Sequence, residues 1–328
     1  MKKLLSKLVL YVLTIIGVIS LNFFLIHLMP GDPLIHLLGE ENYFYLSTQK
    51  PDVLETLKAQ YGLNNPLYKQ YFCYLTKTLK LDLGWSFHYC QPVFQVILFR
   101  LKWTLVLLVP SILIAGLLGG ILGALGALKN GHILDFLLTS GFLFLYGIPN
   151  YCMGLLFLMI FAFYLNIFPL GGMVEQTSCG LISLLDILHH MCLPLSVLVL
   201  HNTAYNYIIM HNTVKDILEE EYVLTAISKG LNQRQILFNH VFKNALPPLI
   251  TAIALDFGFI AGGALFVEII FSWQGMGTLI YDAIISRDYP LISGSLFVLT
   301  VCVILANVFA DLFYAVIDPR IRDNVAIF

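Results

Sequence analysis

Long apolar stretches separated by short polar segments occupy most of the chain. An α-helix needs about 20 residues to cross about 30 Å of hydrocarbon, and each stretch reaches this length. A charged side chain at the centre of a bilayer is costly, so stretches free of Asp, Glu, Lys and Arg indicate membrane spans. The stretches are 8–31, 103–128, 136–174, 187–214, 289–310 and 244–267, the last interrupted only by Asp256. We therefore predict an all-α integral membrane protein with six transmembrane helices.

The third stretch, 136–174, is long enough for one span and a further non-spanning piece. Gly147, Pro149 and Asn150 lie inside it, and residues of these types interrupt helices. A break in the helix is expected there.

The first stretch follows Lys2, Lys3 and Lys7 and in this respect resembles a signal peptide. Its apolar run is longer than that of a signal peptide, and no cleavage site with small residues precedes Asp32. We therefore expect a retained membrane anchor.

Basic residues set the expected orientation, because they accumulate on the cytoplasmic side. The outer segment 169–186 then contains no Lys or Arg, and 268–288 contains only Arg287. Both termini are predicted to be cytoplasmic. The basic residues on that side are Lys2, Lys3, Lys7, Lys129, Lys215, Lys229, Arg234, Lys243, Arg320 and Arg322.

The outer segment 30–102 is expected to form short helices lying against the membrane. An amphipathic stretch, 53–61, is followed by a turn and then by an aromatic run, 68–74. Cys73 and Cys90 could pair there in an oxidising compartment. The predicted organisation is 1–102 for the first helix and this outer segment, 103–322 for the membrane core with a cytoplasmic loop at about 211–246, and 323–328 for a short tail.

Composition agrees with this class and excludes others. Of 328 residues, 59% are hydrophobic and only 12% are charged, whereas soluble domains are about a quarter charged. A net charge of -2 argues against nucleic acid as a partner. The six cysteines form no CxxC pair, and no HExxH pair or GxxxxGK[ST] phosphate loop occurs. These absences disfavour a membrane enzyme and leave any ATP chemistry to another chain.

Polar residues inside the spans are candidates for function. Asn202, Asn206 and Asp256 could line a translocation path or could form hydrogen bonds between helices, and both interpretations stay open. Glu268 and Asp311 lie near span ends, where a snorkelling or a structural role is expected. The remaining candidates are soft or borderline metal ligands: His189, His190, Met191, Cys192, His201, Met210 and His211.

The loop at 211–246 has the pattern of two short helices around a turn. Glu219 to Glu221 suit the positive end of a helix dipole, Lys229 suits the last turn, and Gly230 can adopt a left-handed cap. Asn232 and Gln235 have the spacing of a capping box. A second helix should then carry Ile236, Leu237, Val241 and Phe242 until Pro247-Pro248 starts the next span.

The pattern of this helical hairpin has three interpretations. A DNA-binding helix-turn-helix is disfavoured, because membrane spans hold both ends and few basic residues are present. A plain connecting hairpin and a docking element remain. Ala226 and Gly230, four residues apart, favour docking, since small residues on one helical face let another backbone approach closely.

The same loop resembles the EAA loop of binding-protein-dependent ABC importer permeases. The matching segments are Glu221-Tyr222-Val223, Ala226, Lys229-Gly230-Leu231 and Asn244-Ala245-Leu246-Pro247-Pro248. Ile227 departs from the family's basic residue, and Ser228 departs from its small alanine. The resemblance implies that the loop forms coupling helices that sit in a groove of a cytoplasmic ATPase subunit. The coupling residues would be Glu220, Glu221, Ala226, Lys229, Gly230 and Leu231.

Further segments are similar to one branch of that family, the permeases for dipeptides, oligopeptides and nickel. They are Pro30-Gly31-Asp32-Pro33, Tyr61-Gly62-Leu63, Pro66-Leu67, Gln70-Tyr71, Asp82-Leu83-Gly84, Ser86, Phe271-Ser272-Trp273, Gly275, Gly277, Arg287-Asp288-Tyr289-Pro290, Asn307, Asp311, Tyr314 and Asp318-Pro319-Arg320. Gln274 stands where the branch usually has proline.

The resemblance implies a type I importer permease fold in a bacterial inner membrane, working by alternating access. It implies as partners a homologous second permease subunit, two ATPase subunits that carry ATP and Mg, an extracytoplasmic solute-binding protein and membrane lipid. This chain would then hold no cofactor, no metal and no catalytic residue, and a histidine at the position of His190 is usual whatever the substrate. An ATP-independent channel would leave the EAA-like loop unexplained.

Overall fold

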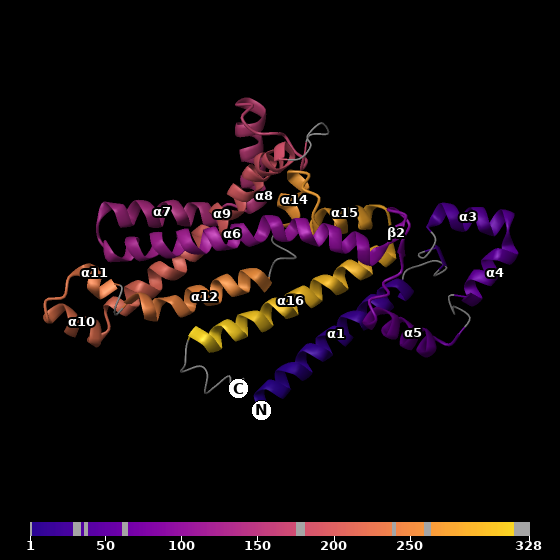
Figure 1. The fold of residues 1–328 in the computed structure, drawn as a ribbon, viewed down its shortest axis with the longest axis horizontal. Helices are drawn as coiled ribbons and strands as arrows, with labels where there is room; N and C mark the ends of the chain where they lie inside the picture. The colour runs from indigo at the N-terminus through magenta and orange to yellow at the C-terminus, as the bar shows by residue number, and fades with distance from the viewer. Residues whose placement is uncertain are drawn as a thin grey trace. The chain divides into compact units, whose positions relative to one another are not determined.

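The chain folds almost entirely into helices in the computed structural model, which describes residues 2–28, 34–35, 39–60, 65–174, 181–237, 241–258 and 264–317 (Figure 1). The motif segments 30–33, 61–63 and 318–320 and the tail 323–328 lie outside these residues, as does the side chain of Asp311. Two compact units are distinguished. The first comprises Met1–Trp103 and Gly275–Ile304, and the second comprises Thr104–Gln274 and Leu305–Phe328.

The first unit contains the expected short helices. Its elements are α1 (Lys2–Leu28), α3 (Glu40–Gln49), α4 (Pro51–Gln60), α5 (Leu67–Leu79), strands β1 (Trp85–Ser86) and β2 (Gln91–Pro92), α15 (Met276–Ile285) and parts of α6 (Val93–Leu128) and α16 (Tyr289–Ile317). The predictions of helices at 53–61 and 68–74 are confirmed by α4 and α5. Cys73 and Cys90 both carry free thiols, so the suggested pairing is not present.

A buried aspartate attaches the β1–β2 hairpin to the start of α16. Ser86 donates a hydrogen bond of 2.6 Å to the Asp288 carboxylate, and the backbone N–H of His88 donates one of 3.1 Å. Asp288 also accepts from the backbone N–H of Leu291, which caps α16. Ser86 and Asp288 are both buried. The motif residues that resembled the permease branch therefore have a structural role in this unit.

A second set of contacts supports the same hairpin. Tyr89 donates 3.0 Å to Asp282 of α15 and accepts 3.1 Å from Arg100 of α6. Burial raises the pKa of the Tyr89 phenol, an effect that the neighbouring guanidinium of Arg100 opposes. The phenol is thus held neutral between a donor and an acceptor.

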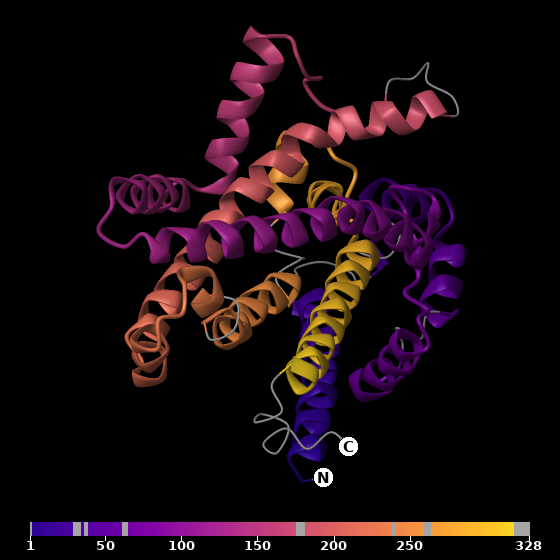
Figure 2. The same cartoon turned by 60° about the vertical axis from the view of Figure 1, so that its left-hand side comes forward.

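The second unit consists of helices that pack around α6 and α9. They are α7 (Ile133–Gly147), α8 (Asn150–Phe157), the π-helix η1 (Leu158–Tyr164), α9 (Leu181–Leu218), α10 (Glu221–Ser228), α11 (Gln233–Ile236), α12 (Phe242–Gly258) and α14 (Leu265–Ile270). The chain bends by 97° between α7 and α8, at Gly147 and Pro149 (Figure 2). The predicted break in the third apolar stretch is confirmed.

Several helices have the length and apolarity of membrane spans. Three qualify by themselves, Val93–Leu128, Leu184–Leu218 and Tyr289–Val308, and the bent pair Ile133–Gly147 with Asn150–Tyr164 has the length and apolarity of a broken span or a re-entrant loop. Val9–Phe24 and Asn244–Phe257 are shorter apolar helices within the first and fifth predicted stretches. The described residues therefore support a multi-pass membrane protein, while the count of six stays a prediction.

Glycines on α6 bring α9 unusually close. A Cβ atom added at Gly119 would lie 2.5 Å from the Cβ of Asn206, and one at Gly123 would lie 2.7 Å from the carbonyl oxygen of Tyr207. At Gly126 it would lie 2.5 Å from the Tyr207 hydroxyl. Helices in lipid gain no hydrophobic free energy from association, so small residues at close crossings supply the packing.

Glycines on a neighbouring face of α6 let α12 pack equally closely. A Cβ atom at Gly116 would lie 2.5 Å from the Ile253 side chain, and one at Gly120 would lie 2.8 Å from that of Leu249. Glu268 of α14 is fully buried and accepts a hydrogen bond of 2.7 Å from Thr104 of α6. The structural role expected for Glu268 is confirmed.

Replacing Gly123 with leucine is expected to destabilise the second unit by about 1–3 kcal/mol, because the new side chain meets the α9 backbone. Thermal unfolding of the detergent-solubilised protein measures the loss. The matched control is Gly141→Leu, since Gly141 of α7 has nothing within 4 Å of an added Cβ. Equal melting temperatures for the two variants would contradict the close crossing.

Candidate functional site

The helix α10 has the ends that its sequence predicts, with a shift of one or two residues. Glu221 occupies its first turn, whereas Glu219 and Glu220 lie in the turn before it. The helix ends at Ser228, so Lys229 follows the last turn instead of standing in it. Only glycine enters the left-handed region without steric cost, so Gly230, at φ 80°, can reverse the chain there. The backbone N–H of Leu231 donates to the carbonyl of Ala226 at 3.4 Å, which closes the C-terminal cap.

The predicted capping box is confirmed at α11. The backbone N–H of Gln235 donates 2.9 Å to the Asn232 side chain, and the backbone N–H of Asn232 donates 3.2 Å to the Gln235 side chain. Ile236 of α11, Leu237, Val241 and Phe242 of α12 all have helical geometry, as predicted, with a π-helical turn at Leu237 and at Val241. Residues 238–240 lie outside the described residues.

Pro247 and Pro248, predicted to start the next span, are preceded by helix. Both lie inside α12, which begins at Phe242. Each proline removes one N–H donor, but α12 is held near its start by packing of Ala245 and Leu249. Tertiary packing therefore extends the helix in front of the prolines.

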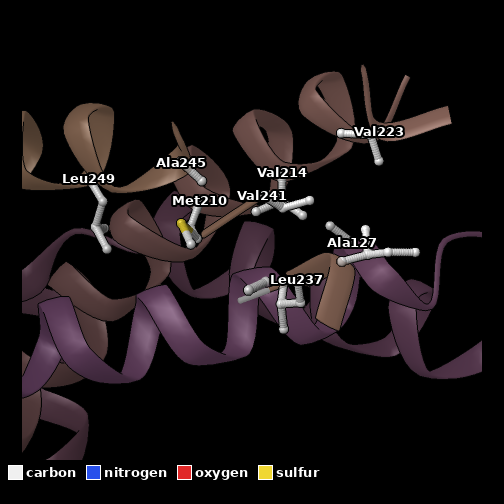
Figure 3. Packing of buried hydrophobic residues seen from close by; sticks show 10 residues of the cluster. Ala127, Met210, Val214, Val223, Leu237, Val241, Ala245 and Leu249 are labelled. Carbon is white, nitrogen blue, oxygen red and sulfur yellow. The ribbon is translucent and has the colours of Figure 1, made fainter. Parts of the chain in front are cut away.

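A buried apolar cluster, called the hairpin cluster below, joins α10 and α11 to three longer helices. Figure 3 shows these side chains converging between the ribbons. Burial of each valine, leucine or isoleucine side chain contributes about 1.5–3 kcal/mol. The helical hairpin is therefore packed onto the ends of these helices and not merely tethered. The members are Ala124 and Ala127 of α6, Met210 and Val214 of α9, Val223 of α10, Ile236 of α11, Leu237, Val241, and Ala245 and Leu249 of α12.

The predicted coupling residues divide into buried and exposed groups. Glu220, Glu221, Lys229 and Gly230 are exposed, and Leu231 packs at the margin of the hairpin cluster. Ala226 is only 4% exposed. The prediction that Ala226 and Gly230 lie on one helical face is therefore wrong. Ala226 lies one turn after Val223, on the side of α10 that faces the core, while Gly230 lies beyond the end of the helix.

Four polar contacts that the sequence did not predict reinforce this region. Asn244 of α12 donates 2.8 Å to the hydroxyl of Tyr222 of α10, which ties the helical hairpin to the following span. His211 of α9 lies 2.8 Å from the carboxylate of Asp135 of α7. Thr139 contacts the same carboxylate at 3.1 Å and the Tyr207 hydroxyl at 2.9 Å.

The histidines suggested as metal ligands make other contacts. His211 pairs with Asp135, His190 lies 3.1 Å from the carboxylate of Asp186, and His189 contacts the carbonyl of Ile167 at 3.0 Å. Within the ranges that the structure describes, no three His, Cys, Asp or Glu side chains are grouped for a metal ion.

Two of the polar residues predicted for the spans, Asn206 of α9 and Asp256 of α12, lie near each other. Asn206 is fully buried, Asp256 and Asn202 are partly buried, and the Asn206 amide lies beside the Asp256 carboxyl group. This contact between α9 and α12 agrees with the interpretation of Asn206 as a residue that connects helices. A place for Asn202, Asn206 and Asp256 on the translocation path stays a prediction.

Aromatic rings lie next to this pair. Tyr146 of α7 stacks on His201 and on Tyr205 of α9, each with a centroid separation of 6.1 Å. Tyr205 interacts in turn with Asp256. We call Asp256, Asn206, Tyr205, Tyr146 and His201 the Asp256 cluster.

Comparison with known proteins identifies similar chains along nearly the whole sequence. A family described as "Binding-protein-dependent transport system inner membrane component" matches residues 115–323. The chain is 32% identical to the dipeptide transport system permease protein DppB of Escherichia coli K12, over 97% of this chain and 98% of the relative. It is 35% identical to a putative peptide permease protein of Brucella suis, over 92% and 93%. It is 32% identical to the oligopeptide transport system permease protein AppB of Bacillus subtilis, over 94% and 95%.

Truncating Val223 to alanine is expected to lower the free energy of opening the helical hairpin by about 1–3 kcal/mol, because it removes two methyl groups from the hairpin cluster. Hydrogen exchange of the backbone amides in 221–236 measures the change. The control is Thr225→Ala in the same helix, at an exposed position, with an expected effect below about 0.5 kcal/mol. Equal exchange rates in both variants would show that the cluster does not hold α10.

Proposed function

Because this chain belongs to the family of binding-protein-dependent transport system inner membrane components, we propose that it is the membrane-spanning permease subunit of an ATP-driven importer of peptides. The observation that carries the proposal is the helical hairpin, with one face packed in the hairpin cluster and charged side chains exposed on the other. The relatives are named for dipeptide, di/tripeptide and oligopeptide transport, which favours peptides over nickel chelates as substrate.

The proposed assembly contains this chain, a homologous second permease, two ATPase subunits that bind ATP and Mg, and an extracytoplasmic solute-binding protein. In this arrangement the helical hairpin and both termini are cytoplasmic, in a bacterial inner membrane, and the chain crosses it six times in the manner of type I importers. This chain holds no cofactor itself. The ATPase subunits would bind the exposed residues of the helical hairpin, namely Glu220, Glu221, Lys229 and Gly230.

The hairpin cluster supports a mechanical role for this contact. It includes side chains from α6, α9 and α12, so displacement of α10 changes the packing at the ends of all three helices. ATP binding elsewhere can then stabilise one of two packings of the helices, which is the physical content of alternating access. A channel that opens without ATP has no need for a helical hairpin packed in this way.

Reversing the charge of Lys229 is expected to weaken the ATPase contact and to reduce peptide uptake at least about tenfold, since like charges facing each other at an interface cost several kcal/mol. Co-purification of the ATPase subunits and uptake into proteoliposomes measure the effect of Lys229→Glu. The control is Lys80→Glu, an equally exposed lysine of the other unit. Normal assembly and uptake with Lys229→Glu would argue against docking at the helical hairpin.

The hydrogen bond between Tyr222 and Asn244 offers a test of transmission. Tyr222→Phe removes the hydroxyl that Asn244 contacts and leaves the aromatic ring in place. Loss of one such bond, worth about 0.5–1.5 kcal/mol, is expected to lower peptide uptake per ATP hydrolysed by about 2–10-fold with the complex intact. Tyr68→Phe, at an exposed position of α5, is the matched control. Unchanged coupling in Tyr222→Phe would show that α12 is driven by the apolar contacts alone.

A further inference from the structure

Helix α5 packs against the end of α1 that is remote from the N-terminus (Figure 1). The Tyr71 hydroxyl lies 2.7 Å from that of Ser20, and Oε1 of Gln70 lies 3.1 Å from Nε2 of His27. Ser20 belongs to the apolar helix Val9–Phe24. One side of α5 therefore lies at the depth of a membrane span and not beyond it.

A second span holds α5 at the same level. The Tyr74 hydroxyl lies 3.0 Å from that of Ser293, near the start of α16, and Asn22 of α1 donates 3.2 Å to the backbone carbonyl of Ser293. Tyr289–Val308 of α16 has the length and apolarity of a membrane span. Since α1 ends and α16 begins beside it, α5 lies where hydrocarbon gives way to headgroups.

One side of α5 that faces away from these spans is apolar. Tyr68, Phe72, Leu75 and Leu79 recur at intervals of four, three and four residues, so they lie on one face of the helix. Tyr68, Phe72 and Leu79 are 61%, 60% and 55% exposed, and Leu75 is partly exposed. We call these four residues the apolar row. Contiguous exposed apolar surface of this kind marks a contact with a membrane or another protein.

The exposed apolar surface of α1 continues onto the apolar row. Phe24 of α1 is exposed, and its ring is stacked on that of Tyr71 with 6.5 Å between the centroids. The Tyr71 ring in turn contacts the Phe72 ring at 5.7 Å. Acyl chains that cover Phe24 in its apolar helix therefore also reach Phe72.

The adjacent side of α5 is cationic. Lys69, Cys73 and Lys77 follow one another at intervals of four residues, and Lys80 directly follows the last turn. All four are exposed, and the helix contains no Asp or Glu. We call Lys69, Lys77 and Lys80 the lysine row. Ammonium groups beside an apolar helix face suit the phosphates of anionic lipids.

We infer that α5 is a binding site for anionic lipid in the outer leaflet. The apolar row inserts among acyl chains, and the lysine row binds the headgroup phosphates. The sequence predicted only that helices of this segment lie against the membrane, whereas the structure assigns the two faces of α5 and adds a preference for negatively charged lipid. Tyrosine and lysine side by side are typical of a membrane–water interface, which favours lipid over a protein as the cover. The inference holds whatever the substrate.

The test places a bimane fluorophore on either side of α5 in the assembled complex, reconstituted in phosphatidylcholine vesicles. One variant carries Phe72→Cys, and its matched control keeps the native Cys73 between the lysines. All other cysteines are serine in both. Lipid with brominated acyl chains is expected to quench the fluorophore at position 72, and aqueous iodide the one at position 73. Quenching at position 72 by iodide, or by neither reagent because protein covers it, overturns the inference. If Phe72→Cys does not assemble, Leu79→Cys reports on the same face.

The headgroup preference is tested with the fluorophore at position 72. Brominated phosphatidylglycerol, diluted into phosphatidylcholine, is expected to quench more strongly than brominated phosphatidylcholine at the same mole fraction. Lys69→Gln with Lys77→Gln should reduce this preference about fivefold for each lysine. The control is Lys129→Gln, exposed between α6 and α7, which should leave the preference unchanged. Equal quenching by the two lipids with all lysines present, or a preference that survives the loss of both, overturns the inference.

Discussion

The close crossing of α6 with α9 and α12 is the interaction on which the remainder of the second unit depends. In a bilayer, apolar side chains gain little by leaving lipid for a neighbouring helix, so association relies on dense van der Waals packing. Gly119 and Gly123 provide it against α9, and Gly116 and Gly120 provide it against α12. These glycines determine where α9 and α12 lie, and therefore where the residues on them meet.

The hairpin cluster and the Asp256 cluster both contain residues of α9 and α12. Gly119 lies against Asn206, which faces Asp256, and Gly123 lies against Met210 of the hairpin cluster. Since α9 is continuous from Leu181 to Leu218, the two clusters are connected by helical backbone and not by flexible loop. A rigid connection of this kind is required if a displacement of helices at one membrane surface is to change the helix packing within the membrane.

Polar side-chain contacts also connect the helices of the second unit. His211 with Asp135 and Thr139 with Tyr207 connect α7 to α9, and Tyr222 with Asn244 connects α10 to α12. Asp135, Tyr222 and Asn244 lie in the first turns of α7, α10 and α12, where polar side chains cost less than at the centre of a span. Apolar packing holds the helices together there, and the hydrogen bonds and the His211–Asp135 contact define which helix surfaces meet.

Local features of this protein followed from the amino-acid sequence alone, because they depend on residues close together in the chain. The apolar stretches, the break at Gly147 and Pro149, the capping box of Asn232 and Gln235 and the left-handed Gly230 are of this kind. Features that depend on which surfaces meet did not follow. Ala226 was expected to share a helical face with Gly230 and is instead buried against the core, the prolines of α12 lie inside the helix, and the pairing of His211 with Asp135 joins residues 76 positions apart. Only the packing of α6, α9 and α12 decided these points, because burial and long-range contacts are set by the neighbouring helix and not by the local pattern.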